Sequence, residues 1–265
     1  MNRFLIFCFL SILALSEPCK ADFQGFYLGQ SFGNAHNTGN FSSESSSVAD
    51  FGLPHTLTLS SSGKGYNESF FGEVYGGYGC IYFCHLYVGL RLGASLSDFD
   101  VKNRSSSSLS QTLSSTIPIS STITNSLKGK LWLPEVTIDQ KIGWVFNERT
   151  LVFGLVGVAL NQPSLKGFSV ASDTGGGDTP FDGSVSFSLD KKGQLAHFRW
   201  GVGLDYKFTC NWAVQLLYTQ TNYGRLRFSG SGIDSDGESV SLSATSSIKA
   251  KLGRKVFSIG FSRYF

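Results

Sequence analysis

The chain has 265 residues and a formal charge of +3, and it combines few charged side chains with many aromatic ones. Charged residues make up 15% of the sequence and aromatic residues 14%, whereas an average soluble domain is roughly 25% charged. Coiled coils and helical bundles are disfavoured, because both need many Ala, Glu, Lys and Leu residues. The net charge is too weak for a nucleic-acid-binding surface. The length fits one all-β domain or at most two small domains.

The start of the chain has the anatomy of a secretory signal peptide. A short cationic segment precedes an apolar stretch from Phe4 to Leu15, and Cys19 and Ala21 supply small residues for a cleavage before Asp22. A cut after Ser16 is the alternative. The apolar stretch is too short to cross the roughly 30 Å of membrane hydrocarbon as a helix, so a membrane anchor is disfavoured.

Residues 1–21 are therefore assigned to a removed signal peptide, and residues 22–265 to one mature domain that crosses a membrane during export. The longest apolar run of that domain, Leu151 to Leu160, is well short of the roughly 18 residues that a membrane helix requires. The low charge and high aromatic content therefore need an explanation other than a membrane helix.

The strongest signal in the mature chain is an alternation with period two. In residues 198–208 every second side chain is apolar, and those between are charged residues or glycine. Because successive side chains of a β-strand point to opposite faces, such a segment is a strand with one apolar and one polar face. The same pattern occurs in residues 85–96, 131–144, 212–219 and 257–265, and more weakly in residues 25–33, 69–79 and 151–160. Eight strands are predicted.

The connections between these strands are unequal in length. Short turns are expected near Cys80–Cys84, Phe146–Thr150 and Thr209–Asn211, and long Ser- and Gly-rich loops at residues 37–65, 103–128, 163–195 and 229–247. Short turns at one end and long loops at the other are typical of a bacterial outer-membrane barrel, with the short turns in the periplasm. Ten strands are the alternative, if Leu57–Ser61 or Val185–Leu189 joins the wall.

A lipid environment explains the alternation and the low charge together. Within a membrane every backbone polar group must be paired, and a closed antiparallel barrel achieves this without an exposed edge. The apolar faces then contact lipid and the polar faces line the lumen; in a soluble barrel or sandwich the apolar face would instead point into a core. Aromatic residues near the strand ends are expected to form two interfacial girdles: Trp144, Phe146, Phe208, Trp212, Tyr264 and Phe265 at one end, and Tyr66, Phe70, Trp132 and Phe228 at the other.

Both ends of the mature chain resemble a known family. Residues 24–29 (QGFYLG) are similar to the opening strand, and residues 217–224 (LYTQTNYG) to the seventh strand, of small proteobacterial outer-membrane surface antigens with an OmpA-like eight-stranded β-barrel. The last strand resembles that family's terminal signal for the outer-membrane assembly machinery, carried here by Phe257, Ile259, Phe261 and Phe265. It departs from the family at Arg263, where an aromatic residue is frequent. The loops resemble nothing known.

Eight charged residues fall on the faces expected to point inward. They are Glu73, Arg91, Glu135, Asp139, Lys141, Arg199, Asp205 and Lys207. An eight-stranded barrel is about wide enough for side chains to fill it, and buried charges need partners. We therefore expect a network of paired charges that fills the lumen. A narrow ion path is the alternative.

No cofactor or metal site is predicted. The Cys-x3-Cys spacing at Cys80 and Cys84 has no second pair and fits zinc poorly, so a disulfide between them is one interpretation. Two reduced thiols, or a bridge to Cys210, are the alternatives. The four histidines belong to no HExxH motif, and no GxSxG motif occurs, so an enzyme is not expected.

Members of that family are surface antigens, adhesins or narrow porins, so the resemblance implies location in the bacterial outer membrane and barrel architecture more than one activity. Because binding residues concentrate on exposed loops, we expect a surface antigen with an adhesive function. The expected partners are outer-membrane lipid, the assembly machinery and a host or environmental ligand of the exposed loops, and not nucleic acid. The alternative function is a small-solute porin or channel.

Overall fold

The computed structural model describes residues 23–50, 54–82, 85–113, 117–131, 134–175, 181–235 and 241–265, and these form antiparallel strands and short connections. The predicted signal peptide lies outside these residues. The strands are β1 (Gly25–Asp50), β2 (Pro54–Tyr82), β3 (Leu86–Ser97), β4 (Asp100–Leu113), β5 (Ile117–Leu131), β6 (Glu135–Asn147), β7 (Thr150–Leu160), β8 (Pro163–Gly175), β9 (Phe181–Lys192), β10 (Ala196–Lys207), β11 (Trp212–Ser235) and β12 (Ser241–Tyr264). Among the described residues, no helix is long and apolar enough to span a membrane.

Eight of the strands close into a barrel in the order β1-β12-β11-β10-β7-β6-β3-β2. The predicted eight-stranded ring is thereby confirmed. The two segments that would have made ten strands are not additional wall strands: Leu57–Ser61 continues β2, and Val185–Leu189 belongs to β9 of a separate sheet.

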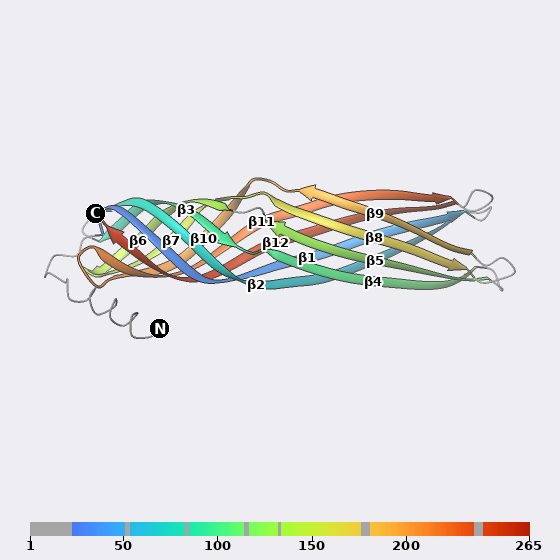
Figure 1. The fold of residues 1–265 in the computed structure, drawn as a ribbon, viewed down its shortest axis with the longest axis horizontal. Coiled ribbons are helices and arrows are strands. Elements are labelled where there is room, and N and C mark those ends of the chain that lie inside the picture. Colours follow the sequence, from blue (N-terminus) through green and yellow to red (C-terminus); the bar gives the residue numbers. More distant parts are fainter. Residues whose placement is uncertain are drawn as a thin grey trace, which may run out of the picture.

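The other four strands form an antiparallel sheet in the order β4-β5-β8-β9. Figure 1 shows this sheet beyond one end of the barrel, beside the far halves of β1, β2, β11 and β12, with the C-terminus at the opposite end. Each of its strands lies next in the chain to a barrel strand, with a break of two or three residues between β3 and β4, β5 and β6, β7 and β8, and β9 and β10. We call the part beyond the breaks the extension.

The extension corrects the prediction of long loops. Most of residues 37–65, 103–128, 163–195 and 229–247 lie in strands. In β4 the buried Val101 lies between the more exposed Asp100 and Lys102, and in β12 the buried Ile248 and Ala250 flank the exposed Lys249. This is again period two, and a polar face turned to water suits an antiparallel strand. The Ser-rich composition concealed the pattern.

Proline and glycine mark the level of the breaks. Pro134 lies between β5 and β6, where it suits an interruption of the ladder because proline has no backbone N–H to donate. β11 continues through this level with a bulge between Asn222 and Arg225, where Gly224 has a φ of 79°. Glycine adopts such a left-handed conformation without a steric penalty.

The barrel turns its apolar face outward. Leu92 and Phe198, for example, are 52% and 59% exposed, whereas the residues directly before and after each of them in the strand point inward and are buried. We call this outward surface the apolar belt. Tyr264 is an exception to the predicted girdles, since it is buried in the lumen and bonded to Asp205. Trp132 and the side chain of Phe228 lie outside the described part of the structure.

Candidate functional site

The barrel lumen brings together all eight charged residues that were expected there. Each of them is buried, and each occupies an inward position of its strand. Arg254 joins them from β12, so that four carboxylates and five cationic side chains lie inside the described barrel. They form three groups along the axis, which we call the central, distal and proximal clusters; distal means toward the extension.

The central cluster is a closed cycle of two acids and two guanidinium groups, formed by Glu73, Arg91, Asp139 and Arg199. Arg91 donates from Nη2 to Glu73 Oε2 at 2.8 Å, and its Nη1 lies 3.8 Å from Asp139 Oδ2. Arg199 lies 3.6 Å from Glu73 and 3.7 Å from Asp139. Each charge therefore faces two opposite charges, which offsets the cost of removing it from water.

The distal cluster centres on Glu135 of β6, next to the break after β5. Arg254 Nη1 lies 3.2 Å from Glu135 Oε1, and the Tyr223 hydroxyl donates to Glu135 Oε2 at 2.5 Å. Arg254 Nε donates to Asn37 Oδ1 at 3.2 Å, and Asn37 in turn donates to the Asp98 carbonyl in the break after β3. The cluster thus links barrel strands to an interruption.

Arg254 was not predicted, because the last strand was expected to begin near Val256, whereas β12 begins at Ser241. Every second residue back from the inward Ser258 also points inward, first Val256 and then Arg254, because period two continues through this region. The signal was available in the alternation itself.

The proximal cluster pairs Lys141 with Asp205. Lys141 Nζ lies 2.5 Å from Asp205 Oδ2, and Asp205 also accepts hydrogen bonds from Gln215 Nε2 at 2.8 Å and from the Tyr264 hydroxyl at 3.1 Å. The Lys141 ammonium lies 4.0 Å from the centre of the Phe153 ring. Aromatic rings also hold Lys207, whose ammonium lies 4.2 Å from the ring centre of Tyr264. Such cation–π contacts stabilise desolvated cations.

Two inward glycines make room for the carboxylates of the central cluster. A Cβ atom at Gly93 would lie 2.6 Å from Glu73 Oε1, and one at Gly157 would lie 2.4 Å from Asp139 Oδ1. Both distances are too short for any larger residue. Glycine at these positions therefore determines where the two carboxylates can lie.

Apolar packing closes both ends of the charged region. Toward the C-terminus the inward side chains are mostly aromatic, including Phe23, Tyr27, Tyr75, Tyr87 and Phe153. In the extension the interior is apolar, with Phe41, Phe99, Val101, Leu127, Leu131, Leu165, Tyr223, Leu226, Ile248, Ala250 and Leu252 in one cluster. The charges are thus enclosed between an aromatic layer and an apolar core.

A polar bridge lies inside the extension as well. Asn125 of β5 donates to Ser43 Oγ of β1 at 3.0 Å and accepts from Ser169 Oγ of β8 at 2.7 Å. All three residues are buried. The two sheets of the extension are therefore in direct contact at Asn125.

A family model described as the outer membrane protein beta-barrel domain matches residues 5–265. The chain belongs to this family. No curated protein matches it. Similar solved structures include Ail, the attachment invasion locus protein of Yersinia pestis, with 12% identity, 83% of this chain and 99% of that chain covered and a TM-score of 0.23. OprG from Pseudomonas aeruginosa has 10% identity, 88% and 97% coverage and a TM-score of 0.34. The outer membrane protease OmpT from Escherichia coli has 11% identity, 91% and 97% coverage and a TM-score of 0.28.

This outer-membrane barrel protein therefore lies in the bacterial outer membrane, with its apolar belt in lipid. The short turns of such barrels face the periplasm. In this chain Glu148–Arg149 and residues 208–211 form turns at the same end as the C-terminus. The extension consequently projects from the cell. The identities of the similar structures are too low to assign any activity to the chain.

The remaining candidate residues of this barrel protein lie in the last ten residues of the chain and near the end of β2. Phe257, Ile259 and Phe265 of the predicted assembly signal are exposed on the outward face, and Arg263 places its guanidinium 5.2 Å from the Phe265 ring centre. Cys80 is half-buried near the end of β2. Because Cys84 lies outside the described residues, the disulfide stays a prediction. No group of three potential metal ligands occurs in the described part of the chain.

Proposed function

We propose that this protein is a closed outer-membrane anchor that displays a long β-structure at the cell surface, as a surface antigen with an adhesive function. The enclosed lumen supports the first part: charges that pair with one another between an aromatic layer and an apolar core serve to fill the barrel rather than to conduct. No enzymatic activity, cofactor or metal is part of the proposal.

The length of the strands carries the second part. β1 has 26 residues and spans about 85 Å at roughly 3.3 Å per residue, whereas a membrane strand needs only about 9–11 residues. The 12 residues of β1 that follow Thr38, nearly half of the strand, stand beyond the row of Tyr66 at the outer end of the apolar belt. Structure that reaches so far beyond the membrane supports contact with the surroundings, since binding residues concentrate on exposed segments.

Planar-bilayer recording of the purified protein tests the closed lumen. We expect no stable current steps. Reproducible unitary steps would reject the closed anchor and favour the alternative, a small-solute porin, for which the nine charged side chains of the lumen would line the path.

Surface display is tested on intact cells with a membrane-impermeant maleimide. Ser60→Cys and Ser106→Cys, both exposed in the extension, should be labelled. The native Cys80 and Cys210 near the periplasmic turns should not be labelled, which makes the unmodified protein the matched control. Labelling of the unmodified protein alone would mean that the orientation is inverted.

Adhesion is tested with cells of a non-adherent strain that express the protein, on surfaces coated with extracellular-matrix proteins. A shortened variant in which a two-residue Asn-Gly turn replaces residues 107–123 can keep Ser106 paired with Thr124, and it removes only the distal part of the β4–β5 hairpin. Cells with the full chain should bind better than cells with the shortened chain. If cells with the two chains bound equally well at equal surface amounts of protein, the protein would be an anchor without adhesive function.

A further inference from the structure

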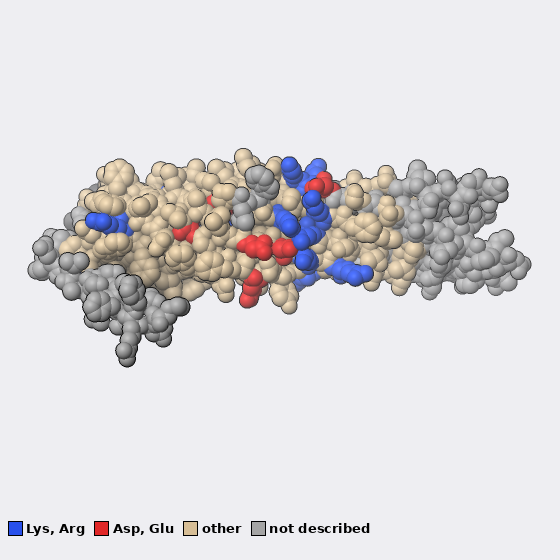
Figure 2. All heavy atoms as spheres, viewed as in Figure 1, with Lys and Arg blue, Asp and Glu red and all other residues tan. Residues whose placement is uncertain are grey.

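Cations gather on the outer surface just beyond the apolar belt. Figure 2 shows Lys and Arg side chains in a band across the middle of the long axis. By the strand register, Arg225 and Arg227 of β11 lie next to Lys249 and Lys251 of β12, and all four residues are exposed. We call these four residues the cationic quartet.

The quartet consists of like charges placed directly opposite each other. Arg225 pairs with Lys251, and Arg227 pairs with Lys249, in the β11–β12 ladder. Like charges in such cross-strand positions destabilise a sheet. In the described residues no carboxylate lies within 4.0 Å of any of the four. Their arrangement therefore costs stability, and no carboxylate of the described residues relieves it.

Cations on the opposite sheet are arranged differently. Lys102 and Lys128 also face each other, in the β4–β5 ladder, but both contact Asp100, at 3.7 and 2.9 Å. Lys166 lies 3.7 Å from Asp190. The opposed cations Lys102 and Lys128 are thus relieved by a carboxylate, whereas those of the quartet are not.

The bulge in β11 is what places the arginines outside. Before it, the odd-numbered residues Thr221 and Tyr223 are buried; after it, the even-numbered Leu226 is buried and Arg225 and Arg227 are exposed. One additional residue reverses the faces of a strand. Without the bulge both guanidinium groups would point into the apolar core of the extension.

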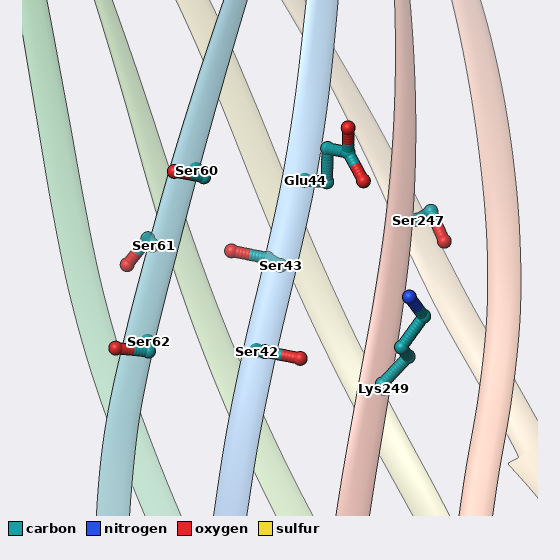
Figure 3. A pocket seen from close by; sticks show the side chains of 8 residues that line it. All are labelled: Ser42, Ser43, Glu44, Ser60, Ser61, Ser62, Ser247 and Lys249. Carbon is teal, nitrogen blue, oxygen red and sulfur yellow. The ribbon is translucent and has the colours of Figure 1, made fainter.

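The quartet borders a shallow hollow. Lys249 lines it together with Ser42, Ser62, Ser247 and Glu44, among others. Figure 3 shows Lys249 and Ser247 on β12 beside Ser42 and Glu44 on β1. Hydroxyl groups next to an ammonium suit an oxyanion, and Glu44 is the acidic residue of the hollow, beyond ion-pair distance from Lys249.

The position along the strands identifies the source of the anion. Tyr66, an exposed aromatic residue at the outer end of the belt, lies in one cross-strand row with Thr38 and Gly253. The next outward row on the same face contains Lys64, Asn40, Lys251 and Arg225. Two residues correspond to about 7 Å along a strand, which is headgroup depth above an interfacial aromatic ring.

We propose that the cationic quartet binds the phosphate groups of lipids in the outer leaflet. Bound phosphates would offset the repulsion between the opposed cations, and the apolar belt directly below would hold the acyl chains of the same lipids. This site is independent of the adhesive function, because it needs only the location of the barrel.

The test uses the purified protein in a non-ionic detergent and native mass spectrometry. The probes are phosphatidic acid and a diacylglycerol with the same acyl chains, which differ only in the phosphate.

Two variants are compared with the native protein. The quartet variant carries Arg225→Gln, Arg227→Gln, Lys249→Gln and Lys251→Gln; the control carries Lys102→Gln, Lys128→Gln and Lys166→Gln. We expect the protein to retain phosphatidic acid and not the diacylglycerol. Basic residues near an anionic group each strengthen binding, so the loss of four of them should weaken the binding of phosphatidic acid by the quartet variant by at least about tenfold, and the control variant should lose much less.

Three results would overturn the proposal. The first is equal retention of phosphatidic acid by the quartet variant, and the second is an equal loss in the control. The third is displacement of the lipid by inorganic phosphate or by heparin at matched charge concentration, which would mean a site for a soluble anion. A melting curve in lipid-free detergent checks the premise: the quartet variant should melt at a higher temperature, since opposed like charges are gone, and a lower temperature would contradict the unrelieved repulsion.

Discussion

The central cluster allows the cost of removing one charge to be worked out from its geometry. Arg91→Met deletes the guanidinium that donates to Glu73 at 2.8 Å. Glu73 and Asp139 would then share only Arg199, at 3.6 and 3.7 Å, which is too far for a hydrogen bond. Removing one partner of a buried ion pair costs about 3–5 kcal/mol, and a hydrogen bond to a charged group accounts for about 1.5–3 kcal/mol of this.

Removing Glu73 together with Arg91 should restore most of the free energy of unfolding that Arg91→Met loses. In the double variant Arg91→Met with Glu73→Met, the remaining pair is Asp139 and Arg199, one acid and one base at 3.7 Å. Replacing a complete buried pair by apolar residues of similar volume is close to neutral. The double variant should therefore be more stable than Arg91→Met alone by about 2 kcal/mol or more, a coupling within the range of contacting residues.

Urea unfolding from phospholipid vesicles, followed by tryptophan fluorescence, measures these differences. The matched control is Glu68→Gln, which removes an exposed contact with His36 at 3.5 Å and should change the free energy of unfolding by less than about 1 kcal/mol. Two results would refute the reasoning. The first is an Arg91→Met variant as stable as the control. The second is a double variant whose loss in free energy of unfolding equals the sum of the losses of Arg91→Met and Glu73→Met measured separately.

Three further changes test other parts of the structure. Gly157→Ala crowds the Asp139 carboxylate and should lower the free energy of unfolding by about 1–3 kcal/mol, whereas Gly154→Ala on the same strand, whose added Cβ would have its nearest neighbour at 3.8 Å, should leave it almost unchanged. Leu92→Arg in the apolar belt should cost about 2–4 kcal/mol if its depth is close to the midplane, measured by the same unfolding experiment. Phe265→Ser should reduce the amount of protein in the outer-membrane fraction, and an unchanged amount would remove Phe265 from the assembly signal.

The alternation of the sequence was sufficient to predict the ring and its inward charges. Arg199, Asp205 and Lys207 could be placed inside because period two is exact over β10. Their partners could not be predicted, since a partner across the lumen depends on the stagger of strands that are distant in the chain. Asp205, for example, meets Lys141 from β6 and Tyr264 from the end of β12.

Composition was a poorer guide than periodicity. The Ser-rich segments were interpreted as loops because serine and glycine are common in loops, yet Ser43 and Ser169 alternate with outward residues and bond across the interior of the extension. Tyr264 was assigned to a girdle because an aromatic ring near a strand end suits an interface, but its place in the alternation put it in the lumen. Where composition and periodicity disagreed, the periodicity predicted the structure correctly.

Along β3 and β4 the outward face changes from apolar to charged at one level, although the same alternate residues point outward before and after it. In the path of β3 and β4, the outward positions run Leu90, Leu92, Ala94 and Leu96 and then Asp98, Asp100, Lys102 and Arg104, while the inward positions run from Arg91 to Val101. The side that faces out is the same before and after the break. What changes is the solvent outside the strands. In lipid the outward side chains must be apolar, so the charged side chains lie inside the barrel and pair there. In water the charged side chains can point outward, so the interior becomes an apolar core. The sequence therefore indicates the level of the outer membrane boundary on this protein, which lies where the outward residues change from aliphatic to charged.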